Sequence, residues 1–148
     1  MDYWLPEAYW NPFFLGLTEE SMERLRGGAN VWICEGLFDL GPLERIVDGV
    51  VLATVRAKLS DRHIEFLRRW MRPGARVFMA YDMDETGKKQ VHGWVDEATG
   101  KRRWGALERL ERVAISAQAV SYRGGKDPGE IWERTGTPGL RAAFAHVL

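Results

Sequence analysis

Three acidic side chains lie within four residues in the stretch AYDMDETG, residues 80–87. Asp82, Asp84 and Glu85 follow the apolar run 77–81, which is typical of a buried strand. Carboxylates this close repel one another, and the repulsion costs free energy unless a positive charge is shared between them. The stretch therefore indicates either a solvated loop or a site that holds a cation.

Further ionisable groups follow two other apolar runs. Glu35 comes directly after the run 31–34, and Lys126 and Asp127 come after a run within 113–122. If these runs are parallel strands of one sheet, their carboxyl ends meet at one edge, where open α/β sheets bind ligands. We therefore expect acids from three separate segments to converge on one site.

Oxygen ligands without His or Cys suit a hard cation, which usually keeps several waters and is completed by a substrate phosphate. The sequence therefore predicts a Mg2+ or Mn2+ site in which Asp82 and Asp84 project to the same side of an extended backbone. Glu35 would either complete the metal shell or act as a general acid or base at a phosphate oxygen. Two cations in such a site would stabilise the attacking and leaving oxygens of a phosphoryl transfer. Lys126 supplies a positive group of the kind that binds phosphate.

Strands alternate with helices along the chain, which implies parallel pairing and right-handed crossovers. Apolar runs predict strands at 30–34, 50–54, 76–81 and within 113–122. Helices are expected at 37–46, after a Ser60 cap, from about Thr86, at 106–112 and from Pro128. The segment 90–105 carries a Thr99-Gly100 turn signal and favours a hairpin or irregular excursion over an interrupted helix. We therefore expect an α/β, Rossmann-like fold with a roughly four-stranded, mainly parallel sheet and helices on both faces.

The composition is that of one globular domain. Lys plus Arg and Asp plus Glu are both 21 in 148 residues, so the chain does not coat polyanions generically, although a local basic patch is possible. Cys34 is the single cysteine, which excludes a disulfide within the chain and favours a reducing, cytoplasmic location. No apolar segment approaches membrane-spanning length, so no membrane partner is expected.

Three ordered motifs bring a family into view. VWICEGLFD at 31–39, AYDMDETGKK at 80–89 and YRGGKDPGEIW at 122–132 resemble the Toprim domain, most closely that of bacterial and phage DnaG-type primases. Toprim is a metal-binding module that those primases share with type IA and type II topoisomerases, OLD-family nucleases and some small ribonucleases. The resemblance implies a Toprim domain at 30–148, preceded by an aromatic-rich extension at 1–29.

The resemblance also implies roles for individual residues. Glu35 takes the acid/base position, and Asp82 and Asp84 take the metal-ligand positions. Asp39, one helical turn beyond Glu35, matches the second, supporting acid of the EGxxD form. Asp127 lies in a primase-like KDP signature, where it would be the third metal-associated acid.

The chain departs from the primase pattern in two respects, and the first concerns the substrate path. The primase form usually has a small Gly-Thr-Ala stretch after the second strand, whereas this chain reads RAK at 56–58. Arg56 and Lys58 are expected near the acidic edge, where they would clamp a nucleic-acid phosphate or merely neutralise the acids. Lys88 would reach a phosphate from a helix start or lie on a solvated helix face.

The second departure concerns the upstream domains. Primases of this type also need a zinc-binding domain and a basic subdomain upstream, and 1–29 contains no Cys or His cluster, so primer synthesis by this chain alone is not expected.

The opening stretch MDYWLPEAYWNPFF, residues 1–14, holds six aromatic side chains. They would cap the sheet as core, stack on unpaired bases, or dock a separate primase or helicase subunit. The sequence thus leaves three functional hypotheses. The first is a Mg2+-dependent, primase-like nucleotidyltransferase module of DNA replication that acts on DNA or RNA. The second is a stand-alone Toprim nuclease, and the third is a non-catalytic accessory protein of a replication or mobile-element complex.

Overall fold

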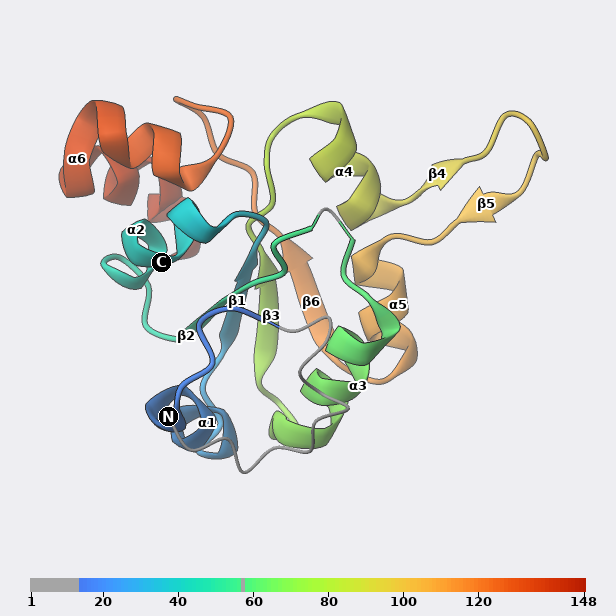
Figure 1. Ribbon diagram of the computed structural model, residues 1–148, viewed down its shortest axis with the longest axis horizontal. Coiled ribbons are helices and arrows are strands. Elements are labelled where there is room, and N and C mark those ends of the chain that lie inside the picture. The colour runs from blue at the N-terminus through green and yellow to red at the C-terminus, as the bar shows by residue number, and fades with distance from the viewer. Residues whose placement is uncertain (1–13, 57) are drawn as a thin grey trace.

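A four-stranded parallel sheet forms the centre of the computed structural model, which describes residues 14–56 and 58–148 (Figure 1). The strand order is β2-β1-β3-β6, and all three pairings are parallel. The strands are β1 (Val31–Cys34), β2 (Val50–Ala53), β3 (Arg76–Met79) and β6 (Ser116–Ala119). The α/β fold predicted from the alternating pattern is therefore confirmed.

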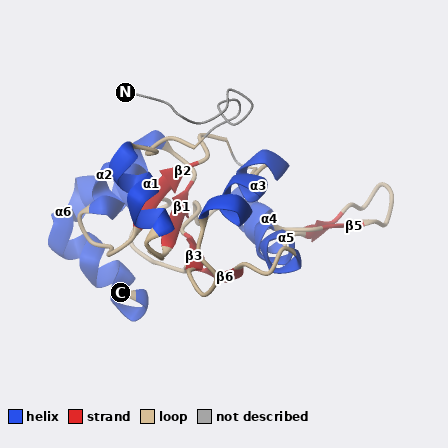
Figure 2. Ribbon diagram, turned by 90° about the horizontal axis from the view of Figure 1, so that it is seen from below, coloured by secondary structure: helices blue, strands red, loops and turns tan. Residues whose placement is uncertain are grey.

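Helices cover both faces of this sheet (Figure 2). On one side lie α2 (Leu37–Glu44) and α6 (Pro128–Phe144), and on the other lie α3 (Asp61–Trp70), α4 (Glu85–His92) and α5 (Ala106–Arg112). A short 3-10 turn, Ala145–Val147, follows α6. The predicted caps are present, since Ser60 accepts a hydrogen bond from the backbone of His63 at the start of α3. The helix α1 (Glu19–Arg26) is not among the predicted elements, and its signal in the sequence is a reciprocal cap between Thr18 and Ser21.

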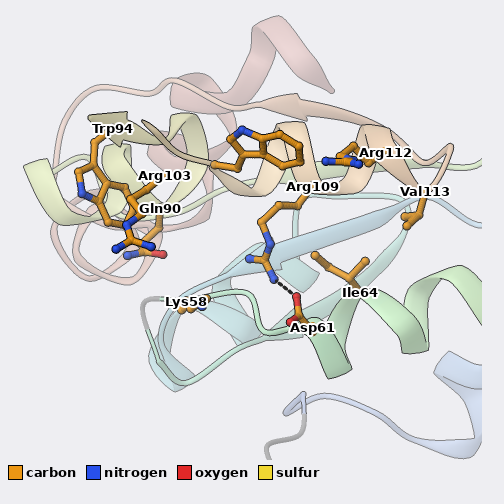
Figure 3. A pocket seen from close by; sticks show the side chains of 10 residues that line it. Lys58, Asp61, Ile64, Gln90, Trp94, Arg103, Arg109, Arg112 and Val113 are labelled. Atoms are coloured by element: carbon orange, nitrogen blue, oxygen red, sulfur yellow. Dashed lines mark hydrogen bonds and ion pairs between the residues drawn. The ribbon is translucent and has the colours of Figure 1, made fainter. Parts of the chain in front are cut away.

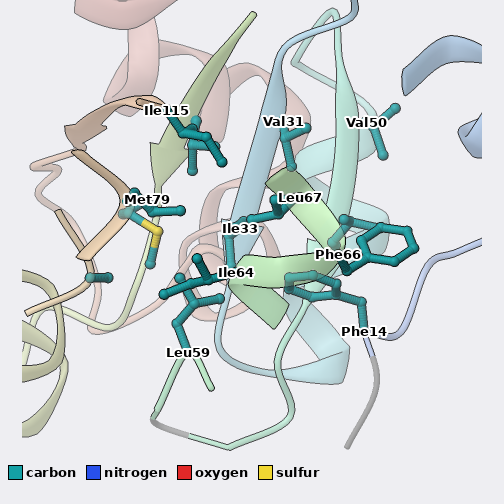
Figure 4. Close-up of a cluster of buried hydrophobic side chains, with 14 of the residues drawn as sticks. Phe14, Val31, Ile33, Val50, Leu59, Ile64, Phe66, Leu67, Met79 and Ile115 are labelled. Carbon is teal, nitrogen blue, oxygen red and sulfur yellow. The ribbon is translucent and has the colours of Figure 1, made fainter. Parts of the chain in front are cut away.

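The core consists of two apolar layers, one on each face of the sheet. Alternate residues of β1 point to opposite faces, so that all four of its side chains are buried. One layer joins β1 to α1, α3 and α5 through Phe14, Met22, Leu25, Ile33, Phe66, Leu67, Val77 and Leu110, among others (Figure 4). The other joins β1 to α2 and α6 through Trp32, Leu43, Phe78, Tyr122, Ile131 and Phe144, among others. Burial on both faces explains why these strands read as continuous apolar runs.

The chain before α1 also contributes to this core. Phe14 is buried against His63 and Phe66, with ring centroids 4.3 Å and 6.0 Å apart. Leu15 exchanges both backbone hydrogen bonds with Ala53, which covers the outer edge of β2. The other N-terminal aromatics, Tyr3, Trp4, Tyr9, Trp10 and Phe13, lie outside the described residues.

A two-stranded hairpin interrupts the crossover between α4 and α5. Its strands β4 (Trp94–Val95) and β5 (Arg102–Arg103) are antiparallel, and Gly100 turns the chain with a φ of +69°. The hairpin projects beyond the body of the protein in both ribbon views (Figures 1 and 2). The hairpin expectation for this segment is confirmed. None of the helices in the described residues is long and apolar enough to cross a membrane.

Candidate metal centre at the carboxyl edge of the sheet

The sheet topology brings the two principal acidic motifs together. The strands β1 and β3 are central neighbours, and the backbone N–H of Ala80 still donates to the carbonyl of Ile33 at 2.8 Å, one residue past the end of β3. Glu35 follows directly on the end of β1, and Asp82 lies three residues past the end of β3. The loops that carry them leave the same edge of the sheet, between α6 and α4 (Figure 1).

Lys126 lies between the two aspartates of the AYDMDETG stretch. Its Nζ is 3.9 Å from Oδ2 of Asp82 and 3.7 Å from Oδ2 of Asp84. The backbone N–H of Met83 donates to the carbonyl of Lys126 at 2.7 Å, which ties the two loops together. In this structure, the ammonium group of Lys126 therefore supplies the shared positive charge that the aspartate pair requires.

Asp84 and Asp127 each have one carboxylate oxygen committed to a helix start. Oδ1 of Asp84 accepts the backbone N–H of Gly87 at 2.7 Å and caps α4. Oδ1 of Asp127 accepts the backbone N–H of Glu130 at 2.8 Å and caps α6. These bonds fix the orientation of both carboxylates and leave Oδ2 of each clear of the cap.

Asp39 is buried and has both oxygens occupied. It is 4% exposed, and its carboxylate accepts the backbone N–H of Gly36 at 3.2 Å and that of Gly129 at 2.8 Å. Burial, followed by repulsion from Asp127, raises the pKa of Asp39 to about 7, although the Gly129 bond acts in the opposite direction. The geometry therefore makes Asp39 a link between α2 and α6 that positions the acidic edge.

Glu35 has a buried carboxylate oxygen with no hydrogen-bond partner among the described residues, Oε1. Burial, followed by repulsion from Asp82 and Asp84, raises the pKa of Glu35 from 4.5 to about 7. A buried polar atom without a partner costs free energy, and such atoms concentrate at functional sites. A cation or a substrate proton at this atom would remove that cost.

The donor set fits Mg2+. Burial, followed by repulsion from Asp127, raises the pKa of Asp82 to about 6, although the positive charge of Lys126 acts in the opposite direction. Within residues 14–56 and 58–148, no three His, Cys, Asp or Glu side chains are grouped tightly enough to form a complete cage. Mg2+ does not require one, because it typically binds through one or two carboxylates and keeps waters and substrate phosphates as its other ligands.

The raised pKa values predict how stability depends on pH without metal. The unfolded chain loses the Glu35 and Asp82 protons near pH 4, but the folded protein keeps them to pH 6–7. The folded state therefore binds more protons in this window, and the stability that these protons confer is lost as pH rises through 7. Chemical unfolding in EDTA should show the wild type losing stability, relative to a Glu35→Gln/Asp82→Asn variant, between about pH 4.5 and 7. A constant difference across that range would contradict the prediction.

Solved structures of primases share this architecture. No protein-family model and no curated protein matches the sequence. The Aquifex aeolicus primase, in a structure of its zinc-binding and RNA polymerase domains, matches 91% of this chain with a TM-score of 0.63 at 22% identity. The RNA polymerase domain of Mycobacterium tuberculosis DnaG matches 84% with a TM-score of 0.58 at 17% identity. A DnaG catalytic domain bound to single-stranded DNA matches 91% with a TM-score of 0.57 at 18% identity.

This chain shares the fold of DnaG-type primase catalytic cores. It covers 30% of the Aquifex chain and 38% of each of the other two, about a third of their length. At these identities the likeness concerns the fold. The roles of the individual acids in the primase-like fold remain predictions.

The predicted basic residues are more dispersed than the acids. Val55 donates its backbone N–H to the carbonyl of Glu35 at 2.9 Å, with a φ of +68° that β-branched residues rarely adopt, so Arg56 begins next to the acidic edge. Lys88 lines a small cavity that Asp82 also lines. Lys58 lines a different cavity, between α3, α5 and the hairpin. The structure thus gathers the acids and Lys126, but it does not place Lys58 in the same cavity.

Two tyrosines that were not predicted as site residues hold the loops around the site through hydrogen bonds. The hydroxyl of Tyr81 shares a hydrogen bond with Oγ1 of Thr54 at 2.9 Å. The hydroxyl of Tyr122 donates to the carbonyls of Tyr81 at 2.9 Å and of Lys126 at 3.1 Å. Each tyrosine stands at or beside one of the three motifs, which is the only signal that the sequence offers for them.

Gly87 lies where a side chain would clash with the loop that carries Asp82 and Asp84. A Cβ added there would lie 2.1 Å from the carbonyl oxygen of Asp82 and 3.2 Å from Oδ1 of Asp84. We expect Gly87→Ala to lower the free energy of unfolding by about 2–3 kcal/mol, the usual cost of overpacking. Gly41→Ala is the control, because its Cβ would meet only the flexible end of Arg45 and should stabilise α2 by about 0.5–1 kcal/mol. Urea unfolding of both variants tests this pair, and equal effects would contradict it.

Proposed function

We propose that residues 30–148 form a Toprim domain that carries out Mg2+-dependent, primase-like phosphodiester chemistry on nucleic acid. The observation that carries the proposal is the pairing of Glu35 with Asp82 and Asp84 at one sheet edge. Glu35 offers a buried oxygen that has no partner within residues 14–56 and 58–148, and the aspartates hold a cationic group between them. The three motifs that supply these residues resemble the Toprim pattern, and the fold is shared with primase cores.

The residues divide the chemistry among themselves. Asp82 and Asp84 would hold the metal through oxygens that now face Lys126, and Asp127 would serve a second cation. Bound Mg2+ supplies stabilisation of the charge that develops on the phosphate oxygens. Lys126, released from the aspartates, would contact a substrate phosphate. Glu35, with its pKa near neutrality, is suited to accept or donate a proton at pH 7.

The proposed substrate is a DNA or RNA strand. One of the similar structures is a DnaG catalytic domain bound to single-stranded DNA, which supports a nucleic-acid ligand for this chain. We also propose that it works with a separate primase or helicase subunit, as expected from its resemblance to DnaG-type primases. Primer synthesis is the first reaction to assay and strand cleavage the second, since the same acid set is suited to both.

Calorimetric titration of Mg2+ and Mn2+ tests the proposal directly. The wild type should bind metal, and binding should strengthen when a short single-stranded oligonucleotide is present. An Asp82→Asn/Asp84→Asn variant keeps the shape of both side chains but removes their charge, so it should lose at least about tenfold in affinity. Asp48→Asn/Glu23→Gln is the matched control, because both acids are exposed and belong to none of the three motifs.

Two results would decide against catalysis at this edge. The first is an absence of metal binding by the wild type with or without oligonucleotide. The second is a double variant that binds metal as tightly as the control. Either result would leave the accessory-protein hypothesis in its place.

A further inference from the structure

A second cavity, of about 440 Å³, lies where the β4–β5 hairpin meets α3 and α5 (Figure 3). We call it the hairpin pocket. The side chains that give it its chemical character are Lys58, Trp94, Arg103, Trp104, Arg109 and Arg112. Figure 3 shows Trp94 and Arg103 on one side of the opening and Arg112 on the other, with Arg109 and Lys58 below.

The hairpin pocket collects positive charge in a chain whose net charge is zero. Four cationic side chains line it, and Asp61 is its single acid. Asp61 is committed to Arg109, whose Nη2 lies 2.7 Å from Oδ1, and Arg109 also donates to the carbonyl of Leu59. Among the described residues, no carboxylate pairs with Lys58 or Arg112. Arg103 lies 3.6 Å from Oδ2 of Asp96, so the surplus of positive charge for an anionic ligand comes from Lys58 and Arg112.

Two tryptophans give the same pocket flat apolar surfaces. Trp94 and Trp104 come from the two arms of the hairpin, where Trp94 pairs in register with Arg103. Trp104 is 44% exposed, and the guanidinium of Arg112 lies over its ring at 4.3 Å from the centroid. An exposed indole that already stacks a planar cation is well placed to stack a planar base, while the guanidinium turns to a phosphate.

We propose that the hairpin pocket binds a single-stranded nucleic-acid segment. An unpaired base would stack on Trp104 and Trp94, and its flanking phosphates would contact Arg103, Arg112 and Lys58. A duplex does not suit the pocket, because the faces of its bases are covered by stacking within the helix. The ligand class rests on the proposed function at the acidic edge, and the pocket adds a place that holds the strand.

The path from the pocket to the acidic edge is short. Val55 is hydrogen-bonded to Glu35, and Lys58 of the pocket rim lies three residues further along the chain, which spans at most ~11 Å. Arg56 lies between them and is exposed. A strand held in the pocket would therefore continue along these cations toward Glu35 and the aspartates.

Fluorescence anisotropy of a labelled oligothymidylate, measured in EDTA, tests the electrostatic half of the proposal. Arg103→Ala/Arg112→Ala should weaken binding at least about tenfold and flatten the dependence of log K on log salt, because two phosphate contacts are lost. The matched control removes the same charge outside the pocket. Arg68→Ala/Arg141→Ala should change affinity less than about twofold, since both side chains lie on exposed helix surfaces.

Substitutions of Trp104 test whether a base stacks on its ring. Trp104→Ala should weaken binding of the oligothymidylate about tenfold, in line with the loss of one stacked base. It should leave binding of an abasic oligonucleotide of the same length nearly unchanged, and Trp104→Phe should restore most of the affinity. Thermal unfolding of each variant confirms that it is folded.

The outcomes separate the pocket from the catalytic site. In EDTA, Asp82→Asn/Asp84→Asn should bind the oligonucleotide at least as well as wild type. If calorimetry finds no metal binding by the wild type but Arg103→Ala/Arg112→Ala still weakens oligonucleotide binding, the pocket is supported and the proposed catalysis is contradicted. Equal losses in the pocket variant and its matched control, tighter binding of duplex, or equal affinity for a single mononucleotide would each overturn the pocket.

Discussion

Replacing Glu35 with Gln is expected to lower metal-dependent turnover of nucleic acid about 10²- to 10⁴-fold, the range that a general acid or base contributes. The same change should leave the metal-free protein as stable as wild type or more stable. Glu35 has a buried oxygen with no partner in the part of the chain that the structure describes, and it lies near two like charges, so its negative charge costs stability in the folded state. Loss of activity with retained stability is expected of a residue that lowers the free energy of unfolding and is kept because it takes part in the reaction.

Single-turnover assays of template extension and of strand cleavage, with thermal unfolding in EDTA, measure both effects. Glu23→Gln is the control, because Glu23 is an exposed acid on α1 and should change neither quantity. If Glu35→Gln retains activity within about threefold of wild type, Glu35 moves no proton in the rate-limiting step. A large loss of stability in the variant would instead show that the carboxylate is structural.

Replacing Asp39 with Ala is expected to lower the free energy of unfolding by about 3 kcal/mol. The change leaves the backbone N–H groups of Gly36 and Gly129 without their acceptor, and each buried unsatisfied donor costs about 1–3 kcal/mol. Burial raises the pKa of Asp39 to about 7, and the cost of burying the carboxylate offsets part of what its two bonds contribute. Because Gly36 and Gly129 are also only half-buried, we expect a value in the lower half of the summed range of about 2–6 kcal/mol.

Urea unfolding of three variants tests the role of Asp39. Asp39→Asn keeps one acceptor oxygen and should lose about half as much stability as Asp39→Ala. Asp48→Ala removes an exposed acid whose partner Arg24 is 3.5 Å away, and it should cost less than about 0.5 kcal/mol. If Asp39→Ala costs no more than Asp48→Ala, the carboxylate does not link α2 to α6. Weaker Mg2+ binding by Asp39→Asn would show that the link also positions Lys126 and Asp127.

Local chemistry determined much of this fold in advance. The Ser60 cap and Pro128 in a first turn mark helix starts that the structure places where the sequence predicts them, and α4 begins at Glu85, one residue before the predicted start. The helix at 106–112 has the predicted bounds. Caps, turns and periodic apolar runs act within a few residues of the chain, so they can be recognised without a tertiary structure. For the same reason, the sequence predicted that acids would follow the ends of strands β1 and β3.

The partners of those acids could be decided only by the tertiary structure. Asp39 and Gly129 are 90 residues apart in sequence, and their hydrogen bond exists because α2 and α6 pack on the same face of the sheet. Lys126 reaches Asp82 and Asp84 because the strand order places β6 beside β3.

The hairpin pocket depends on tertiary packing in the same way. Its cations come from the segment after β2, from the hairpin and from α5, and in sequence they look like separate surface charges. A residue pattern records what each segment can form locally. The packing of segments that are distant in the chain decides which side chains meet. That packing brings Lys126 to Asp82 and Asp84, links Asp39 to Gly129, and forms the hairpin pocket.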